Sequence, residues 1–439
     1  MKTILVIGAG KSATILIEYL CNVCSQNKWK LTVCDADQTM AESKIKNCVY
    51  AQAISINITI EEERRKIIAE ADIVISMLPP QLHILAAQSC IELSKNLLTA
   101  SYADKEITSL NKQIKKKGLL FICELGLDPG IDHMSAMKII DKIRLEGGKV
   151  HSFISHCGGL VAPESDDNPW HYKITWNPRN IVLAGANGAV FRLRNNKEII
   201  SYSEVFKNCQ EVSIPGLFPL AWYPNRDSLS YIENYGLQGA ETFIRTTLRQ
   251  PSFCKGWNTL VQANFTSYND EKQVRGNTTY LQWFNNKLKE SGIDPTTLPE
   301  EFFLQIDYLG MRDNVTADFS SCSSGEILQS LMERKLAMKT DDKDMIVMLH
   351  EIAYTKNDLK KTFISSLIVK GDDQLHTAMA KTVGLPLGIA AKLILQSEIK
   401  LTGLHIPILP EIYNPVLAEL EKHSIKFFEK DLPDSSIHA

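Results

Sequence analysis

Hydrophobic runs and amphipathic segments alternate regularly over the first 130 residues of the chain. Short apolar runs, typical of strands, occupy 3–8, 30–35, 50–56, 72–78, 96–102 and 119–124. Between them, apolar residues at helical spacing predict helices over 11–22, 39–46, 60–71, 81–93 and 105–117. The run from Asp72 to Leu78 is apolar at nearly every position, as in a strand covered on both faces. This alternation predicts an α/β fold with a doubly wound parallel sheet and right-handed crossovers.

The pattern changes after Gly126. An amphipathic helix is expected from Ile131 to about Arg144, and Gly147-Gly148 ends it. Further strands are expected at 149–156, 172–176, 180–184 and 188–193. Helical segments dominate from about 250 to 340, and paired strands follow at 344–354 and 361–369, before a helix over 374–396. The pattern therefore predicts a second domain, rich in antiparallel strands, with a small helical subdomain inserted in it.

These elements divide the chain as follows. Residues 1–130 form a Rossmann-type dinucleotide-binding domain, and residues from about 398 to 439 pack back on it. Residues 131–250 and 341–397 form an α+β domain for substrate binding and dimerisation. Residues 251–340 form the helical subdomain.

The first predicted strand runs directly into a glycine-rich turn, in which residues Val6 to Ala13 read V-I-G-A-G-K-S-A. In a dinucleotide-binding βαβ unit the first glycine allows a tight turn, and the second lets a pyrophosphate approach the backbone. A third small residue lets helix and strand pack closely. Gly8, Gly10 and Ala13 stand at these positions, and the helix that follows would direct its N-terminal N–H groups at the phosphates. The sequence predicts a bound dinucleotide; the alternative is a turn that uses glycine only for packing.

The second predicted strand, Lys30 to Cys34, is followed by Asp35. A carboxylate at this position accepts hydrogen bonds from the adenosine ribose hydroxyls and would repel a 2′-phosphate. Ala36 and Asp37 come next, so neither of these two residues is a cation that could hold such a phosphate. We therefore expect NAD rather than NADP. The alternative is that Asp35 only caps the next helix.

Composition excludes several classes of protein. The 439 residues are 44% hydrophobic and 23% charged, as in an ordinary globular protein. The formal net charge is −3, so the protein has no overall positive charge that would indicate binding to nucleic acid. We find no signal peptide and no apolar run that approaches the about 20 residues of a membrane span. The ten cysteines show no regular spacing of the kind found in a disulfide framework. We therefore expect them to be reduced thiols in a cytoplasmic protein. We expect Cys21 and Cys24 to be helix and loop residues, and we expect no metal site.

Five further segments are richer in polar residues and glycine than packing alone requires. They are 99–102, 124–133, 156–165, 168–177, and 223–228 together with 245–249. The first ends a parallel strand, where open α/β sheets bind ligands. Asp128 could be a general base or a substrate ligand, or Asp128 and Asp132 could be turn and cap residues. Arginines such as Arg226 and Arg249 suit bidentate carboxylate binding, although a single arginine is more often in a surface ion pair.

On these segments the chain resembles the glutamate-forming saccharopine dehydrogenases, also called saccharopine reductases. The residues that carry the resemblance are Gly8 to Ala13, Ser101-Tyr102, Glu124 to His133, Cys157 to Gly159, Pro163 to Ser165, Asn168-Pro169, Tyr223 to Ser228, Thr247 to Arg249, Thr377 to Gly384 and Ile406 to Pro415. The resemblance implies NAD(P)-dependent oxidation of the secondary amine of saccharopine. Hydrolysis of the imine would then give L-glutamate and 2-aminoadipate 6-semialdehyde, in a reversible reaction of lysine metabolism. It also implies a homodimer.

The resemblance also implies the site residues. Cofactor contacts would come from Gly8, Gly10, Lys11, Ser12, Ala13, Asp35, Ala36, Ser55, Ile56, Ile75, Ala100, Ser101, Leu127, Asp128 and Asn177. Substrate contacts would come from Ser101, Tyr102, Asp128, Arg226, Thr247, Leu248 and Arg249. Fungal relatives that use NADP have a Cys-Arg-Thr type of sequence where this chain has Cys34-Asp35-Ala36.

Hydride transfer needs mainly positioning, but a proton must leave the amine and a water must be activated. Tyr102, Asp128 and Cys157 are the candidates for this catalysis, although a cysteine at a glycine turn, such as Cys157, is more often a packing residue than a nucleophile. Two other functions stay open. One is an imine reductase acting on an adduct of a diamine and a semialdehyde, as in carboxynorspermidine synthesis, against which the paired arginines argue. The other is a scaffold that senses NAD without turnover.

Overall fold

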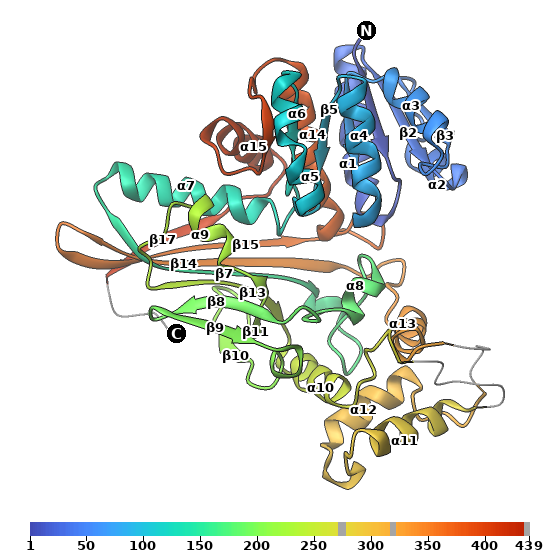
Figure 1. The fold of residues 1–439 in the computed structure, drawn as a ribbon. Helices are drawn as coiled ribbons and strands as arrows, with labels where there is room; N and C mark the ends of the chain where they lie inside the picture. The colour runs from blue at the N-terminus through green and yellow to red at the C-terminus, as the bar shows by residue number, and fades with distance from the viewer. Residues whose placement is uncertain (271–277, 317–321, 434–439) are drawn as a thin grey trace. The chain divides into compact units, whose positions relative to one another are not determined.

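The computed structural model describes residues 1–270, 278–316 and 322–433. It divides into two compact units, one made of Met1–Glu146 and Leu375–Lys426 and the other of Gly147–Gln374 and Phe427–Ala439. The parts of the helical region at 271–277 and 317–321, and the tail at 434–439, lie outside the described residues. Each unit is built around its own sheet (Figure 1).

The first unit holds a seven-stranded sheet in the order β16-β6-β5-β4-β1-β2-β3, in which all neighbours are parallel. Its strands are β1 (Thr3–Ile7), β2 (Lys30–Asp35), β3 (Ala51–Ser55), β4 (Ile73–Ser76), β5 (Asn96–Thr99), β6 (Leu120–Ile122) and β16 (Gly403–His405). Each of the first six lies inside a predicted strand. The order reverses between β1 and β4, and at such a point open α/β sheets bind ligands beyond the carboxyl ends of their strands.

The helices of the first unit are α1 (Thr14–Asn27), α2 (Gln38–Lys44), α3 (Glu61–Ala69), α4 (His83–Glu92), α5 (Lys105–Ser109), α6 (Asn111–Lys116), α7 (Ile131–Leu145), α14 (Ala378–Leu395) and α15 (Pro410–Lys422). Helices α3, α4 and α6 pack on one face of the sheet, around a core that includes Leu5, Val74 and Phe121. Helix α14 packs against α1, where the small residues Gly384 and Gly388 admit Leu16 and Tyr19. By length and apolarity α14 could cross a membrane, but 78% of it is buried inside the structure, as in the core helix of a globular protein.

The second unit holds a ten-stranded mixed sheet with the main order β10-β11-β13-β7-β14-β15-β17, and β8, β9 and β12 at its side. Its strands are β7 (Lys149–Val161), β8 (Ala189–Leu193), β9 (Asn196–Ile200), β10 (Gln210–Val212), β11 (Leu220–Pro224), β12 (Arg226–Asp227), β13 (Thr242–Arg249), β14 (Asp344–Lys356), β15 (Leu359–Lys370) and β17 (Phe428–Pro433). The expected pair at 344–354 and 361–369 is the antiparallel pair β14–β15. In contrast, β13 runs parallel to β7, so the sheet is not purely antiparallel.

The helices of the second unit are α8 (Pro178–Val182), α9 (Ser230–Asn234), α10 (Pro251–Gln262), α11 (Tyr280–Glu290), α12 (Glu300–Leu309) and α13 (Ser324–Lys335). Helices α10 to α13, yellow to orange in Figure 1, lie together in the region expected to be helical. They share one aromatic core with the segment before α8, including Trp170, Tyr172, Trp257 and Trp283.

Two predicted strands and three domain boundaries are corrected by the structure. Residues 172–176 form only one isolated bridge, and 180–184 lie largely in helix α8 and the turn that follows it. Helices α7 and α14 belong to the first unit, because they pack with α15 and α1 rather than in the second core. The tail from about residue 398 was expected to pack on the first domain. Strand β16 and helix α15 belong to the first unit, whereas β17 pairs with β15 in the second unit.

Candidate functional site

The two glycines of the fingerprint differ in what the protein itself requires of them. Gly8 has a φ of +103°, and a Cβ there would lie 2.9 Å from the Met77 carbonyl oxygen. Its N–H donates to the Cys34 carbonyl oxygen of β2 at 2.8 Å, which fixes the turn that follows β1. Gly10 has a φ of −61° and no atom within 4 Å of a Cβ. Gly8 is therefore needed for packing, whereas Gly10 leaves open space that packing does not explain.

The turn leads into helix α1 through a single 3-10 turn, Lys11–Ala13, so the helix itself begins three residues later than expected. Ala13 is buried at 1% exposure, as the third small residue of the fingerprint should be. Lys11 is exposed and Ser12 half-buried. No side chain caps the N-terminus of α1. The N–H of Ala13 donates to the Gly10 carbonyl oxygen at 3.0 Å and the N–H of Thr14 to the Lys11 carbonyl oxygen, so a phosphate here would be favoured mainly by the dipole of the helix.

Substitution of the two glycines should separate binding from packing. Gly10→Ala should keep or raise the stability of the ligand-free protein by up to about 1 kcal/mol, because its backbone conformation suits alanine. It should weaken NADH binding at least about tenfold, because the Cβ occupies the approach of the pyrophosphate. Gly8→Ala should instead destabilise the ligand-free protein by about 1–3 kcal/mol. Thermal unfolding and NADH fluorescence titration measure both; unchanged NADH affinity in Gly10→Ala would favour the packing role.

The Asp35 carboxylate holds the glycine turn. Its Oδ2 accepts from the N–H of Ala9 at 2.7 Å, and its Oδ1 accepts from the N–H of Asp37 at 3.0 Å. The N-cap of α2 is Asp37, whose side chain accepts from Thr39 and Met40. The alternative that Asp35 only caps that helix is therefore wrong. Half-buried at the end of β2, Asp35 retains acceptor capacity for a ribose hydroxyl.

The other expected adenosine contacts differ in exposure. Ser55 is exposed and donates to the Ala36 carbonyl oxygen at 3.1 Å, and the N–H of Ile56 donates to the Asp35 carbonyl oxygen at 3.1 Å. These residues lie together at the carboxyl ends of β2 and β3. Ile75, however, is completely buried within β4, so its side chain does not face a nucleotide in this structure. Only its backbone could meet a nucleotide, and its expected role stays a prediction.

Lys44 is a further cation near the expected cofactor site, nine residues beyond Asp35 and therefore outside the two residues that follow it directly. It lies at the end of α2, and its ammonium donates to the Thr14 hydroxyl oxygen at the start of α1. Burial lowers the pKa of Lys44, while Glu18 and Asp35 act in the opposite direction. A cation therefore does lie near the Asp35 carboxylate, at a place that only the folded chain reveals.

Two loops meet beside the carboxyl end of β5. A Cβ on Gly126 would lie 2.9 Å from the Cβ of Ala100, so the turn from Gly126 to Gly130 packs directly on the strand end. The N–H of Glu124 donates to the Ser101 carbonyl oxygen at 2.9 Å. Ala100, Ser101 and Tyr102 are half-buried, as is Asp128, whereas Leu127 is buried. The structure thus brings together the expected site residues of these two segments.

A buried cluster supports these loops and includes residues to which no role was assigned. Glu124 is 4% exposed with a φ of +58°, and its Oε1 accepts from the N–H of Ala103 at 3.1 Å. Its Oε2 lies 2.9 Å from Nε2 of the fully buried His133. Asp132 Oδ1 accepts from the N–H of Gly130 at 2.6 Å, which supports its turn-forming role. An unusual backbone conformation held by buried polar groups is typical of functional sites.

In the second unit, strand register aligns three expected or candidate side chains. Cys157 on β7 lies opposite Thr247 on β13, and Thr247 lies opposite Tyr223 on β11. Register partners point to the same face of a sheet. Burial raises the pKa of Tyr223 to about 12, against the effects of Arg249 and of a hydrogen bond with the Thr247 side chain. Cys157, Thr247, Tyr223 and, two residues along β13, Arg249 therefore share one face.

Arg249 is the most informative side chain of this face. It is 5% exposed, and its Nη1 donates to the Leu248 carbonyl oxygen at 2.8 Å. Its guanidinium lies 5.3 Å from the ring centre of Tyr172 and 5.7 Å from that of Phe253. Among the described residues, Nε has no hydrogen-bond partner and no carboxylate forms an ion pair with this guanidinium. A buried cation is costly without an anion, so this position is suited to an anionic ligand.

Three expected residues lie away from this face or have another local role. The Leu248 side chain points to the opposite face, into a core with Leu220 and Val347, so only its backbone could meet a ligand beside Arg249. Arg226 is exposed on β12, with a φ of +50°. Asn177 caps helix α8, where its side chain accepts from the N–H of Arg179 at 3.0 Å.

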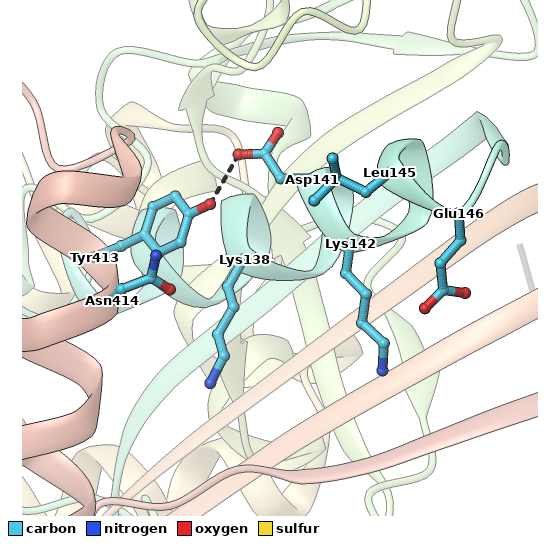
Figure 2. A pocket seen from close by; sticks show the side chains of 7 residues that line it. All are labelled: Lys138, Asp141, Lys142, Leu145, Glu146, Tyr413 and Asn414. Carbon is cyan, nitrogen blue, oxygen red and sulfur yellow. Dashed lines mark hydrogen bonds between the residues drawn. The ribbon is translucent and has the colours of Figure 1, made fainter.

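A hollow of about 310 Å³ lies elsewhere in the first unit, between α7 and α15. Figure 2 shows its lining residues, which are Lys138, Asp141, Lys142, Leu145, Glu146, Tyr413 and Asn414. Tyr413 donates to the Asp141 carboxylate at 2.9 Å, and burial raises the pKa of this tyrosine. None of the expected site residues lines this hollow. Within the described ranges, no group of three or more His, Cys, Asp and Glu side chains could hold a metal ion.

Comparison with known proteins matches nearly the whole chain. A family model for the saccharopine dehydrogenase NADP binding domain matches residues 4–122, and one for the saccharopine dehydrogenase C-terminal domain matches residues 126–425. The chain belongs to the saccharopine dehydrogenase family. A relative in Saccharomyces cerevisiae, named saccharopine dehydrogenase (NADP(+), L-glutamate-forming), is 31% identical over 98% of this chain and 99% of its own length.

A solved structure supports the same family. The apo histidine-tagged saccharopine dehydrogenase (L-Glu forming) from Saccharomyces cerevisiae has a TM-score of 0.90, with 29% identity over 98% of this chain and 100% of that one. The alpha-aminoadipic semialdehyde synthase of Arabidopsis thaliana is 32% identical over 97% of this chain. This chain spans about half of such longer relatives, 44% of the Arabidopsis protein and 47% of its mouse counterpart. The expected resemblance and fold class are thereby confirmed.

Proposed function

We propose that this member of the saccharopine dehydrogenase family oxidises saccharopine with NAD and releases L-glutamate and 2-aminoadipate 6-semialdehyde, in a reversible reaction of lysine metabolism. The buried Arg249 guanidinium, which has no carboxylate partner among the described residues, carries this proposal. Saccharopine has three carboxylates, and its recognition therefore needs cations and hydroxyl donors. Arg249 and Arg226 would each bind one carboxylate, with Thr247 and the backbone at Leu248 beside Arg249.

The residues of the first unit fit a pyridine nucleotide. The open space beside Gly10 would admit the pyrophosphate, which Lys11, Ser12 and Ala13 would line. Asp35, Ala36, Ser55 and Ile56 would lie at the adenosine, and Ala100, Ser101, Leu127 and Asp128 at the nicotinamide. When bound, the nucleotide accepts a hydride from the carbon next to the secondary amine. The chain's own task is to hold that C–H bond in line and to move protons.

The proton balance of the reaction defines what the catalytic residues must do. The amine proton must leave as the C–N bond becomes an imine. A water then adds to the imine carbon, and the C–N bond breaks as glutamate leaves with a proton on its nitrogen. Tyr102, Asp128 and Cys157 are our candidates for these transfers. Purified variants Tyr102→Phe, Asp128→Asn and Cys157→Ser, compared through the pH dependence of kcat, would identify the group that titrates.

The preference for NAD rests on the Asp35 carboxylate, which would repel a 2′-phosphate. Relatives in three fungi carry NADP(+) in their names, and Lys44 near Asp35 is the residue that would favour that cofactor here. We expect a higher initial rate with NAD than with NADP at equal concentration. Asp35→Asn should narrow the difference, since it removes the charge but keeps an acceptor for the N–H of Ala9. A rate with NADP that equals or exceeds the rate with NAD would contradict this preference.

Two other functions would make different demands on the site. A reductase of diamine–semialdehyde adducts would need acidic groups for its diamine, whereas Arg249 offers a cation. A non-catalytic NAD sensor would bind NADH without turnover. We also propose a homodimer, which light scattering of the purified protein tests. A reducing cytoplasm is the compartment that suits a chain whose ten cysteines are thiols.

A further inference from the structure

A buried histidine of the first unit joins the ends of two parallel strands. His83, at the start of α4, is 2% exposed. Its Nδ1 lies 2.7 Å from the hydroxyl oxygen of Ser76, the last residue of β4. Its Nε2 lies 2.7 Å from the hydroxyl oxygen of Ser101, just beyond the end of β5. The three side chains thus form one chain of short hydrogen bonds across the carboxyl edge of the sheet.

The imidazole of His83 is uncharged at neutral pH. Burial lowers the pKa of His83 to about 4, although the Asp104 carboxylate acts in the opposite direction. A neutral imidazole has one N–H donor and one acceptor nitrogen. Each serine therefore meets a ring nitrogen of opposite character, and the direction of one hydrogen bond sets the direction of the other.

Of the three hydrogen-bonded side chains, Ser101 is the one that a ligand could reach. It is half-buried, whereas Ser76 is 1% exposed and completely inside the unit. Strands β4 and β5 lie beyond the reversal in strand order, in the half of a doubly wound sheet that takes the second mononucleotide. The hydroxyl of Ser101 is therefore the one that can reach a ligand, and the imidazole of His83 fixes where its proton points.

We propose that His83, backed by Ser76, is a positioning residue that orients the Ser101 hydroxyl toward the nicotinamide half of the cofactor and the reacting amine. This inference rests on the proposed function and on the family resemblance, which implies that Ser101 contacts both the cofactor and the substrate. His83 acts through Ser101 alone and does not touch the substrate. The role differs from that of the Glu124–His133 pair, which holds the backbone of the following loop.

A double-mutant cycle tests this inference. His83→Leu should lower kcat about tenfold with little change in KM for saccharopine, since an orienting hydrogen bond is lost and no ligand contact. In a protein that already carries Ser101→Ala, His83→Leu should have almost no further effect. If the two reductions multiply, His83 does not act through Ser101, and the inference is wrong.

Further variants separate positioning from folding. Ser76→Ala should lower kcat by a smaller factor than His83→Leu does. Ser76→Thr keeps the hydroxyl and should therefore have a kcat close to that of the wild type. Ser89→Ala is the matched control on the same helix, because Ser89 is equally buried but pairs with Arg64 instead. It should lower the unfolding temperature and leave kcat unchanged. Should His83→Leu fail to fold, the cycle is run with Ser76→Ala in its place.

The readouts also distinguish this inference from the proposed function. If the wild-type protein does not oxidise saccharopine, the proposed function fails, and the same cycle is measured on the dissociation constant of NADH. Coupled effects of His83→Leu and Ser101→Ala on NADH binding would keep the orienting role, and independent effects would remove it.

Discussion

Replacing Arg249 by alanine should weaken saccharopine binding by about 2–4 kcal/mol, or about 30- to 900-fold in kcat/KM, with NADH affinity almost unchanged. The guanidinium is buried against Tyr172 and Phe253 and, within the described residues, lacks a carboxylate partner. A substrate carboxylate bound there would form a charge-assisted pair in a largely desolvated place. Steady-state kinetics with saccharopine, together with NADH fluorescence titration, measure both effects.

The matched control is Arg192→Ala. Arg192 also lies in the second unit, but its Nη1 donates to the carbonyl oxygens of Gln238 and Ala240, both at 2.9 Å. This variant should lower the free energy of unfolding and leave KM for saccharopine unchanged. Arg249→Lys should recover only part of the affinity, because an ammonium cannot form two parallel hydrogen bonds to a carboxylate. If Arg249→Ala loses NADH binding but keeps its KM for saccharopine, the carboxylate assignment is wrong.

Gly130→Ala should abolish measurable activity. Gly130 has a φ of +148°, and a Cβ there would lie 2.1 Å from the Gly126 carbonyl oxygen. The turn from Gly126 to Gly130 must then open, at a cost of more than about 3 kcal/mol. Because that turn packs on Ala100 and carries Asp128, both loops at the end of β5 would move. The rate of saccharopine oxidation and the unfolding temperature are the measurements.

Gly118→Ala provides the comparison for this variant. Gly118 also has a positive φ, +66°, but a Cβ there would meet no atom within 4 Å. It should lower stability by about 1–2 kcal/mol through backbone strain alone and leave kcat unchanged. Equal losses of activity in the two variants would show that the effect of Gly130→Ala is general destabilisation rather than displacement of the site.

Regular hydrophobic periodicity made the first sheet predictable. Its inner strands are covered on both faces, so every residue from Ile73 to Ser76 is buried and the apolar run is easily recognised. The strands predicted over 172–176 and 180–184 were wrong. β-Propensity describes how well a residue fits a half-buried pleated surface, and these residues lie in another environment. Tyr172 and Ile181 are buried in an aromatic core shared with α10 to α13 instead, and Asn177 and Pro178 start a helix.

The candidate site was predictable where a motif marks the end of a strand and not where neighbours come from afar. Gly8 and Gly10 could be read from their spacing, since the turn they form is local, and Asp35 from its place at the end of the second predicted strand. The burial of the Leu248 and Ile75 side chains could not be predicted, because the side of the sheet on which a side chain lies depends on register and on the covering helices. The hydrogen-bond partners of His83 come from two different strand ends, and those of Lys44 from another helix.

The central claim, saccharopine oxidation, is tested most directly by incubating the purified protein with NAD and L-saccharopine, with L-glutamate measured beside the absorbance of NADH. We predict one glutamate released for each NADH formed, and NADH formation slowed at least about tenfold when Arg249→Ala is assayed at a saccharopine concentration near the wild-type KM. A folded protein that binds NADH but produces neither NADH nor NADPH from saccharopine would contradict the account.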